Sequence, residues 1–355
     1  MNKHFLDDPS SYSFDSFGML YHLHNIPRMC EDAWDLASRF TLPTAYQDIN
    51  KIAVLGMGGS AIGADMAAGM NTCRVPITIH RGYNIPPFID KNTLVVASSY
   101  SGSTEETINA FTQALATPAK KLAMTTGGML AELSKSRGVP CFEFSYESPP
   151  RAALPYSLIP FLCILSQLGV ADMDSDTVYD AITTIKMLID GIDKTQSFSG
   201  NPAKMLAQEL YDKICIFYGG EFLAEVARRW KLQVNENAKG WADNEPFPEL
   251  NHNAVVGYRF PVGIQERLMV VMLDSLLLDE RIRLRYPITG ELLENAGVSY
   301  RVVSGTGKSI LAQMLSLIMF GDYVSYYLAL LNHTDPYPLD EVDYLKREIS
   351  QHNTV

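Results

Sequence analysis

The chain has 355 residues, of which 47% are hydrophobic and 19% charged, so it is long enough for two globular domains with a large core. Its 29 basic and 40 acidic residues give a net charge of −11, which argues against sequence-independent binding to nucleic acid or to an anionic membrane. The N-terminus lacks the features of a signal peptide, and we expect no apolar run of membrane-spanning length.

The cysteines favour a cytoplasmic protein with reduced thiols. They are odd in number, scattered, and mostly set in apolar runs, which does not suit a disulfide framework or a zinc site. The five residues are Cys30, Cys73, Cys141, Cys163 and Cys215.

The first 170 residues predict a helical lead-in followed by a parallel sheet. Residues 1–48 carry a partial helical stripe, and their few basic residues do not suggest a DNA-binding helix. Strand patterns then alternate with helical ones, which predicts a doubly wound α/β domain over residues 49–170. The strands are expected at residues 51–56, 75–80, 93–98, 121–125 and 139–144, and an apolar helix at 158–168.

The rest of the chain repeats this order of elements. Residues 171–201 are acidic and polar and suit a linker helix with a loop, so the second domain is expected over residues 202–355. Thr289 is the predicted N-cap and Gly297 the predicted stop of a short helix. We predict two three-layer α/β domains packed pseudo-symmetrically. Strands are expected at residues 213–218, 267–273 and 298–303, and helices at 221–232, 289–296 and 309–331.

A hydroxyl-rich turn follows the predicted strand at residues 93–98. It contains Ser99, Ser101 and Thr104 and leads into a helix. Backbone N–H groups at such a helix N-terminus, with hydroxyls beside them, form a site for an anion. Because no Lys or Arg lies in the turn, the expected anion is a single phosphate rather than a nucleotide with magnesium. A simple Ser/Thr-rich helix cap is the alternative.

A second glycine-rich turn follows the preceding strand of the predicted sheet. Gly58, Gly59 and Ser60 bring the backbone close to a ligand there. The spacing also meets a loose dinucleotide fingerprint, but the acidic residue that should end the next strand is replaced by Arg81, which leaves an NADP-binding alternative. Two anion-binding turns on neighbouring strands favour a sugar-phosphate site.

Two other motifs are set aside. Residues 305–309 resemble the end of a P-loop, but the first glycine of that motif is replaced by Val302, so Ser309 is expected to be a helix cap. Glu105 and Glu106 are adjacent on a helix, so their side chains diverge and would not form one acid–base pair.

Several longer motifs carry a family resemblance. They are GMGGSAIGAD, SSYSGSTEET, PPRAALPYSL, VNENAKGWADNEPFPELNHN, LLLDERIRLR, LAQMLSLIMFGDYVSYYLALL and DPYPLDEVDYLK. From about residue 50 to the end, the chain resembles the sugar isomerase (SIS) superfamily and, within it, the bifunctional phosphoglucose/phosphomannose isomerases. The resemblance implies two SIS domains, a homodimer, no metal or cofactor, and aldose–ketose isomerisation of a phosphorylated hexose.

The resemblance also implies roles for single residues. Ser60, Ser99, Ser101 and Thr104 would hold the phosphate, and Gly59 and Arg151 would lie beside the reacting carbons. Arg151 follows two prolines, so a stiff backbone would present its guanidinium to a developing enediolate; a domain-boundary salt bridge is the alternative.

Three further residues complete the expected machinery. Glu236 would be the base that moves a proton between C1 and C2, although a surface helix-capping Glu has the same sequence signature. His252 would open the sugar ring, supplied by the other subunit, and Lys346 would assist at the ring oxygen unless it is a solvated helix residue. A SIS-fold regulator that binds a phosphosugar without reacting remains the other class of function.

Overall fold

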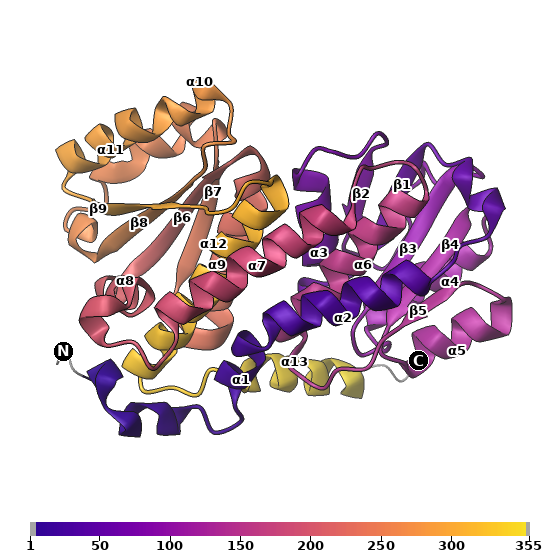
Figure 1. The fold of residues 1–355 in the computed structure, drawn as a ribbon, viewed down its shortest axis with the longest axis horizontal. Helices are drawn as coiled ribbons and strands as arrows, with labels where there is room; N and C mark the ends of the chain where they lie inside the picture. The colour runs from indigo at the N-terminus through magenta and orange to yellow at the C-terminus, as the bar shows by residue number, and fades with distance from the viewer. Residues whose placement is uncertain (1–4, 353–355) are drawn as a thin grey trace.

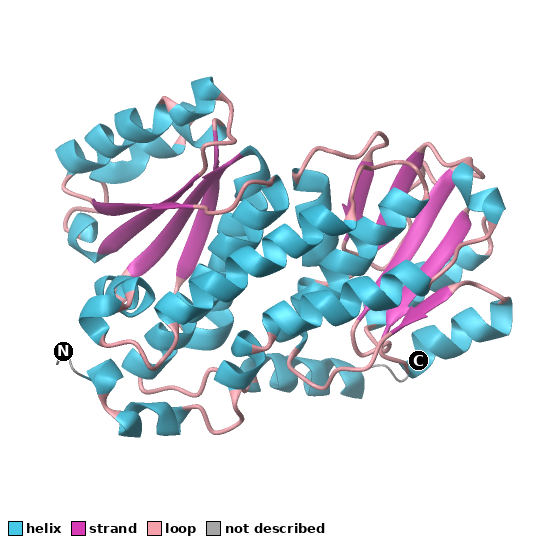
Figure 2. Ribbon diagram, in the orientation of Figure 1, coloured by secondary structure: helices cyan, strands magenta, loops and turns pink. Residues whose placement is uncertain are grey.

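The computed structural model describes residues 5–352 and contains two parallel sheets with helices on both faces (Figures 1 and 2). This confirms the predicted pair of doubly wound α/β domains. The first sheet has the order β2-β1-β3-β4-β5 and the second β7-β6-β8-β9, with every neighbouring pair parallel. The strands are β1 (Lys51–Leu55), β2 (Ile77–His80), β3 (Thr93–Ser99), β4 (Lys120–Thr125), β5 (Cys141–Glu143), β6 (Ile214–Gly220), β7 (Ala242–Phe247), β8 (Leu268–Asp274) and β9 (Ser299–Ser304).

The helices fill the space between the two sheets and cover their outer faces (Figure 1). Helices α3, α6, α7, α9 and α12 lie in the middle of the molecule, between the two sheets. The α-helices are α1 (Met19–His24), α2 (Ile26–Arg39), α3 (Gly58–Gly69), α4 (Glu105–Leu115), α5 (Gly128–Arg137), α6 (Leu154–Gln167), α7 (Ser175–Ile192), α8 (Pro202–Leu210), α9 (Ala224–Ala238), α10 (Glu280–Arg283), α11 (Arg285–Ala296), α12 (Ile310–Leu331) and α13 (Asp340–Gln351).

One large apolar core joins the two domains, and α12 lies at its centre. By length and composition α12 could cross a membrane, contrary to the expectation that no run is long enough, but 94% of its most apolar window is buried inside the protein. It packs against α7, α8 and α9. Helix α7, in the predicted linker, contacts both α12 and α2, so this segment packs against both halves of the molecule.

Three sequence predictions about elements were wrong. Strand β7 was missed because it is a polar edge strand whose middle residues are at least partly exposed. Helix α9 extends six residues beyond the predicted end at Leu232, so Glu236 lies within its last turn. Thr289 is buried inside α11 and does not cap it, whereas Gly297 does end α11 and Ser309 does cap α12.

At the C-terminal end, α13 has no buried residue. The segment before it, residues 335–337, is held to the body of the protein. Phe17 packs its ring on Tyr337, and Ser16 hydrogen-bonds to Asp335. The five cysteines are all free.

Candidate active site

The two glycine- and hydroxyl-rich turns lie side by side, because β1 and β3 are neighbours in the first sheet. The Ser98 hydroxyl donates to the Ser60 carbonyl at 2.8 Å, and the Tyr100 N–H donates to the Ser60 hydroxyl at 2.9 Å. Each turn leads into a helix N-terminus, that of α3 or that of α4. Two helix dipoles and several hydroxyls therefore meet at one edge of the sheet, where they favour an anion.

The second turn is held in shape by a glycine and by paired hydroxyls. Gly102 has a φ of +64°, and a Cβ there would lie 1.8 Å from the Gly127 carbonyl oxygen. The hydroxyls of Ser99 and Thr104 are 2.9 Å apart, while Ser101 is exposed at the rim. A bound phosphate would thus meet donors whose positions are fixed before it arrives.

Arg151 lies directly behind the first turn. The short 3₁₀ helix that carries it, residues 150–153, passes so close to Gly59 that a Cβ on this glycine would lie 2.9 Å from the Pro150 carbonyl oxygen and 3.3 Å from the Arg151 nitrogen. Any larger side chain at Gly59 would therefore push the backbone of Arg151 away from the turn.

The Arg151 guanidinium is almost fully buried, with 4% of its side chain exposed. Its Nε donates to Asn237 Oδ1 at 2.8 Å, and its Nη2 donates to the carbonyls of Pro336 and Tyr337 at 2.6 and 2.7 Å. Its Nη1 lies 3.7 Å from Glu236 Oε2. Burial lowers the pKa of Arg151, and the Glu236 carboxylate opposes that effect.

Glu236 lies in the last turn of α9, facing Arg151, with 31% of its side chain exposed. Burial raises the pKa of Glu236 above its ordinary value, and the charges of Arg151, Arg229 and Lys239 oppose the rise. A carboxylate that is more basic than usual, yet reachable by a ligand, suits a general base.

His252 and Lys346 do not join this cluster within one chain. Glu236 precedes the amino end of β7 and His252 follows its carboxyl end, so six strand residues, about 20 Å at 3.3 Å each, separate the two edges. His252 is exposed. Lys346 is 75% exposed on α13, where it pairs only loosely with Asp343 at 3.8 Å.

Arg81, the residue on which the NADP alternative depended, is occupied by another partner. It hydrogen-bonds to Asp65 of α3, and Asp65 also pairs with Arg228 of α9 at 3.1 Å. This network joins the two domains, so Arg81 has a structural partner where a 2′-phosphate would need a free guanidinium.

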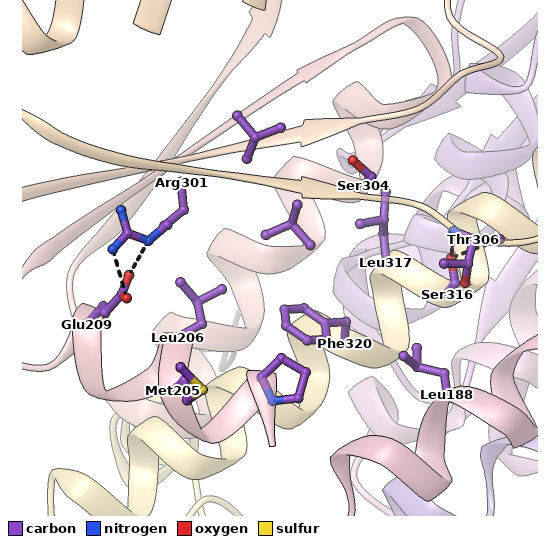
Figure 3. A pocket seen from close by; sticks show the side chains of 13 residues that line it. Leu188, Met205, Leu206, Glu209, Arg301, Ser304, Thr306, Ser316, Leu317 and Phe320 are labelled. Carbon is purple, nitrogen blue, oxygen red and sulfur yellow. Dashed lines mark hydrogen bonds and ion pairs between the residues drawn. The ribbon is translucent and has the colours of Figure 1, made fainter. Parts of the chain in front are cut away.

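The pocket in Figure 3 lies between the second domain and Leu188 of α7, and it shares no residue with the cluster around Glu236. It has a volume of about 420 Å³ and lies beside the edge strand β9, among apolar side chains of α8 and α12 such as Leu206 and Phe320. Arg301 and Glu209 pair with each other at its side. An apolar wall with its one ion pair satisfied does not suit a sugar phosphate.

Sequence reasoning missed two parts of the site, Asn237 and the segment of residues 335–337. Asn237 stands next to Glu236 in the sequence, which is the one signal that could have identified it. The carbonyls of Pro336 and Tyr337 left no signal, because a backbone acceptor can belong to any residue type.

A family model and two curated relatives point to one family, and a solved structure shares the fold. Residues 199–349 match the model of the bacterial phospho-glucose isomerase C-terminal SIS domain. The bifunctional phosphoglucose/phosphomannose isomerase of Caldicellulosiruptor bescii is 36% identical over 94% of this chain and 99% of its own length. That of Aquifex aeolicus is 32% identical over 91% and 99%. Among solved structures, the C-terminal domain of glucosamine-fructose-6-phosphate aminotransferase from Francisella tularensis shares the fold, with a TM-score of 0.73 at 14% identity over 90% of this chain and 98% of that one.

Proposed function

The chain belongs to the family of bifunctional phosphoglucose/phosphomannose isomerases, and from that membership we propose that it interconverts glucose 6-phosphate and fructose 6-phosphate and also accepts mannose 6-phosphate. It is an aldose–ketose isomerase, which we place in the cytoplasm, in keeping with its free cysteines. The observation that carries the proposal is that Arg151 links the two domains: its backbone packs on Gly59 in the first turn, and its Nη1 lies 3.7 Å from the Glu236 carboxylate of the second domain.

The 6-phosphate is held by the two turns. The hydroxyls of Ser60, Ser99, Ser101 and Thr104 and the N–H groups of Gly58 and Gly59 surround one edge of the sheet. Because Gly59 packs on Arg151, a sugar anchored there extends its other end toward Arg151 and Glu236. Binding energy from the phosphate would thus be used to orient the reacting carbons.

Glu236 acts as the base in this proposal. It takes the proton from C2 of the open aldose and returns it to C1, through a cis-enediol(ate). The Nη1 of Arg151, 3.7 Å from the carboxylate, is placed to stabilise the oxygen on which negative charge develops. Glucose and mannose 6-phosphate differ at C2 alone, so a pocket that allows rotation about C2–C3 serves both.

The ring-opening imidazole comes from a second copy of the chain. His252 is too far from Glu236 within one chain, and exposed apolar side chains lie on the segment that follows it: Val256, Phe260 and Val262 are 80%, 76% and 86% exposed. Neighbouring α11 adds Ile288 at 58%. Such a patch is typical of a protein interface, so a homodimer would bury it and bring His252 to the partner's site. Lys346 would assist at the ring oxygen.

The decisive variant for the base is Glu236→Gln. It keeps the size of the side chain but removes its basicity, so kcat for fructose 6-phosphate should fall by about 10²–10⁴-fold. The affinity for 5-phosphoarabinonate, an enediolate mimic, should change by less than about threefold, as measured by calorimetry. Retained turnover would remove Glu236 from its role, and a wild-type protein that binds this mimic without turnover would be a regulator.

The dimer is tested by mixing two inactive variants. In a mixed dimer of Glu236→Gln and His252→Asn, one site combines both intact residues only if the histidine acts on the other chain. Denaturing and refolding the two together should then restore about a quarter of wild-type activity. If His252→Asn alone is inactive, no restoration, with mixed dimers demonstrated by two different tags, would place His252 in its own chain's site. If His252→Asn alone stays active, His252 lies outside the mechanism.

A further inference from the structure

A line of buried polar side chains runs behind Glu236 into the core. Asn237, the next residue of α9, is fully buried and accepts from Arg151 Nε at 2.8 Å through Oδ1. Its Nδ2 donates to the Ser325 hydroxyl of α12 at 3.0 Å, and that hydroxyl donates to the Asp322 carbonyl at 2.8 Å. Because a guanidinium can only donate, the orientation of the Asn237 amide is fixed by chemistry.

This arrangement leaves Arg151 with one free direction. Asn237 holds Nε, and the carbonyls of Pro336 and Tyr337 hold Nη2. Nη1, the remaining nitrogen, lies toward Glu236. The guanidinium is planar, so fixing Nε and Nη2 also fixes the plane and the position of Nη1. Asn237 therefore decides where the positive charge of Arg151 is presented.

The hydrogen-bond acceptors of Arg151 are all neutral, and this distinguishes it from its neighbour Arg229. Arg229 donates to the Asp322 carboxylate at 2.6 Å, and Gln233 donates to the other oxygen of Asp322 at 2.9 Å. A buried carboxylate thus compensates Arg229, whereas the acceptors of Arg151 are an amide and two carbonyls. The charge of Arg151 stays available for Glu236 and for an anionic intermediate.

We propose that Asn237 is a positioning residue of the isomerase: a neutral acceptor that locks Arg151 in place without cancelling its charge. The inference rests on the proposed function. An aspartate of the same size would hold Nε equally well but would form an ion pair with Arg151. The enediolate would then lose part of its electrostatic stabilisation, although the geometry would be preserved.

The test is Asn237→Asp, with Asn235→Asp as its matched control. Both add one negative charge beside Glu236 on the same turn of α9, but the Asn235 amide donates to the Gly240 carbonyl and has no contact with Arg151. For Asn237→Asp we expect kcat for fructose 6-phosphate to fall by about 10-fold or more, with KM changed by less than about threefold. Asn235→Asp should change kcat by less than about threefold.

The pH profile gives a readout that a purely structural role would not change. The charged groups facing Glu236 are Arg151, Arg229 and Lys239, and each of them favours the ionised form of the Glu236 carboxyl group. A carboxylate at position 237 would offset the effect of Arg151. Glu236 would then stay protonated to a higher pH, so the acid limb of kcat/KM should move upward in Asn237→Asp. It should move by a smaller amount in Asn235→Asp, because that side chain is partly exposed and its charge is screened by water.

A second variant covers the case in which Asn237→Asp does not fold. Ser325→Ala removes the hydroxyl behind Asn237 without adding charge. It should lower kcat by about 3- to 10-fold, because Arg151 is held less firmly, and leave the acid limb where it is.

The outcomes separate this inference from the proposed function. If the wild-type protein does not turn over fructose 6-phosphate, the proposed function is wrong. If the wild type is active while Asn237→Asp keeps its kcat and its acid limb and Ser325→Ala keeps its kcat, the positioning role of Asn237 is wrong and the function stands.

Discussion

The two domains share one order of elements, but their candidate site residues lie at opposite ends of the strands. In the first domain they follow the carboxyl ends of β1 and β3, and in the second Glu236 precedes the amino end of β7. In the first domain, the turns after β1 and β3 stay open, with Gly58 and Ser101 exposed. In the second domain, the corresponding turn after β6 is closed by Tyr286 of α11. The Tyr286 hydroxyl accepts from the Gly220 N–H at 3.2 Å and donates to the Leu273 carbonyl at 2.6 Å. The second domain contributes Glu236 from the other end of its sheet.

This difference teaches that repeating a fold does not repeat its binding site. A parallel sheet exposes N–H groups at the carboxyl ends of its strands, and they need a partner in either domain. In the first domain a ligand is free to take that place. In the second, the Tyr286 hydroxyl satisfies the same kind of group, and the proposed catalytic residue Glu236 lies instead at the end of a helix.

The largest expected contrast comes from adding one methyl group to a glycine in each domain. In Gly59→Ala the new Cβ would lie 2.9 Å from the Pro150 carbonyl oxygen, so the backbone of Arg151 must move. We expect kcat/KM for fructose 6-phosphate to fall by about 10²-fold, because Arg151 and the turn lose their alignment.

The matched change in the second domain is Gly220→Ala. Its Cβ would lie 2.6 Å from the Cγ2 methyl of Ile282, which costs about 1–3 kcal/mol of folding free energy. Its kcat, corrected for the folded fraction, should match that of the wild type. Equal losses of kcat in both variants would contradict the division of roles between the two domains.

A smaller contrast comes from removing hydroxyls. Ser60→Ala and Ser101→Ala each take a donor from a phosphate, so KM should rise by about 10- to 100-fold in steady-state assays, with a lesser effect on kcat. Tyr286→Phe removes the hydroxyl that closes the second domain's turn. It should lower the free energy of unfolding by about 1–3 kcal/mol and leave KM unchanged. An unchanged KM in both serine variants would remove the phosphate from these turns.

The smallest effect concerns pH, and it compares the two ends of α9. Burial raises the pKa of both Glu225 and Glu236. If Glu236 is the base, kcat/KM falls as pH drops through its raised pKa, so the acid limb should lie above the 4.5 of an ordinary glutamate. Glu225 only pairs with Arg228 at 3.1 Å, and Glu225→Gln should leave the acid limb in place.

The position of the two glycine- and hydroxyl-rich turns was predictable because their signal is local. Glycines, hydroxyls and a following helix lie within a few residues of each strand, so neighbouring strands bring them together by topology alone. Glu236 was harder to place, since the helix was predicted to end at Leu232, and Asn235 and Asn237 beyond it are weak helix formers. Packing of Val234 and Ala238 in the core overrides that preference.

The hydrogen-bond partners of Arg151 could not be predicted, because they come from two distant parts of the chain. Asn237 lies 86 residues away and Pro336 lies 185 residues away. The closure of the second turn by Tyr286 is also non-local, since the hydroxyl reaches Gly220 from another helix across 66 residues. Contacts of this kind leave no periodic pattern in a sequence.

Because α13 is exposed, we expect that its removal leaves the stability of the fold unchanged and affects turnover alone. None of its residues is buried, whereas the segment before it is held by Arg151 through Pro336 and Tyr337. Cleavage by a protease at residues 338–339 would therefore remove α13 and Lys346 while the rest of the protein keeps its melting temperature. The last helix is an addition to an already complete body, so selection can alter its sequence at little cost to the stability of the enzyme.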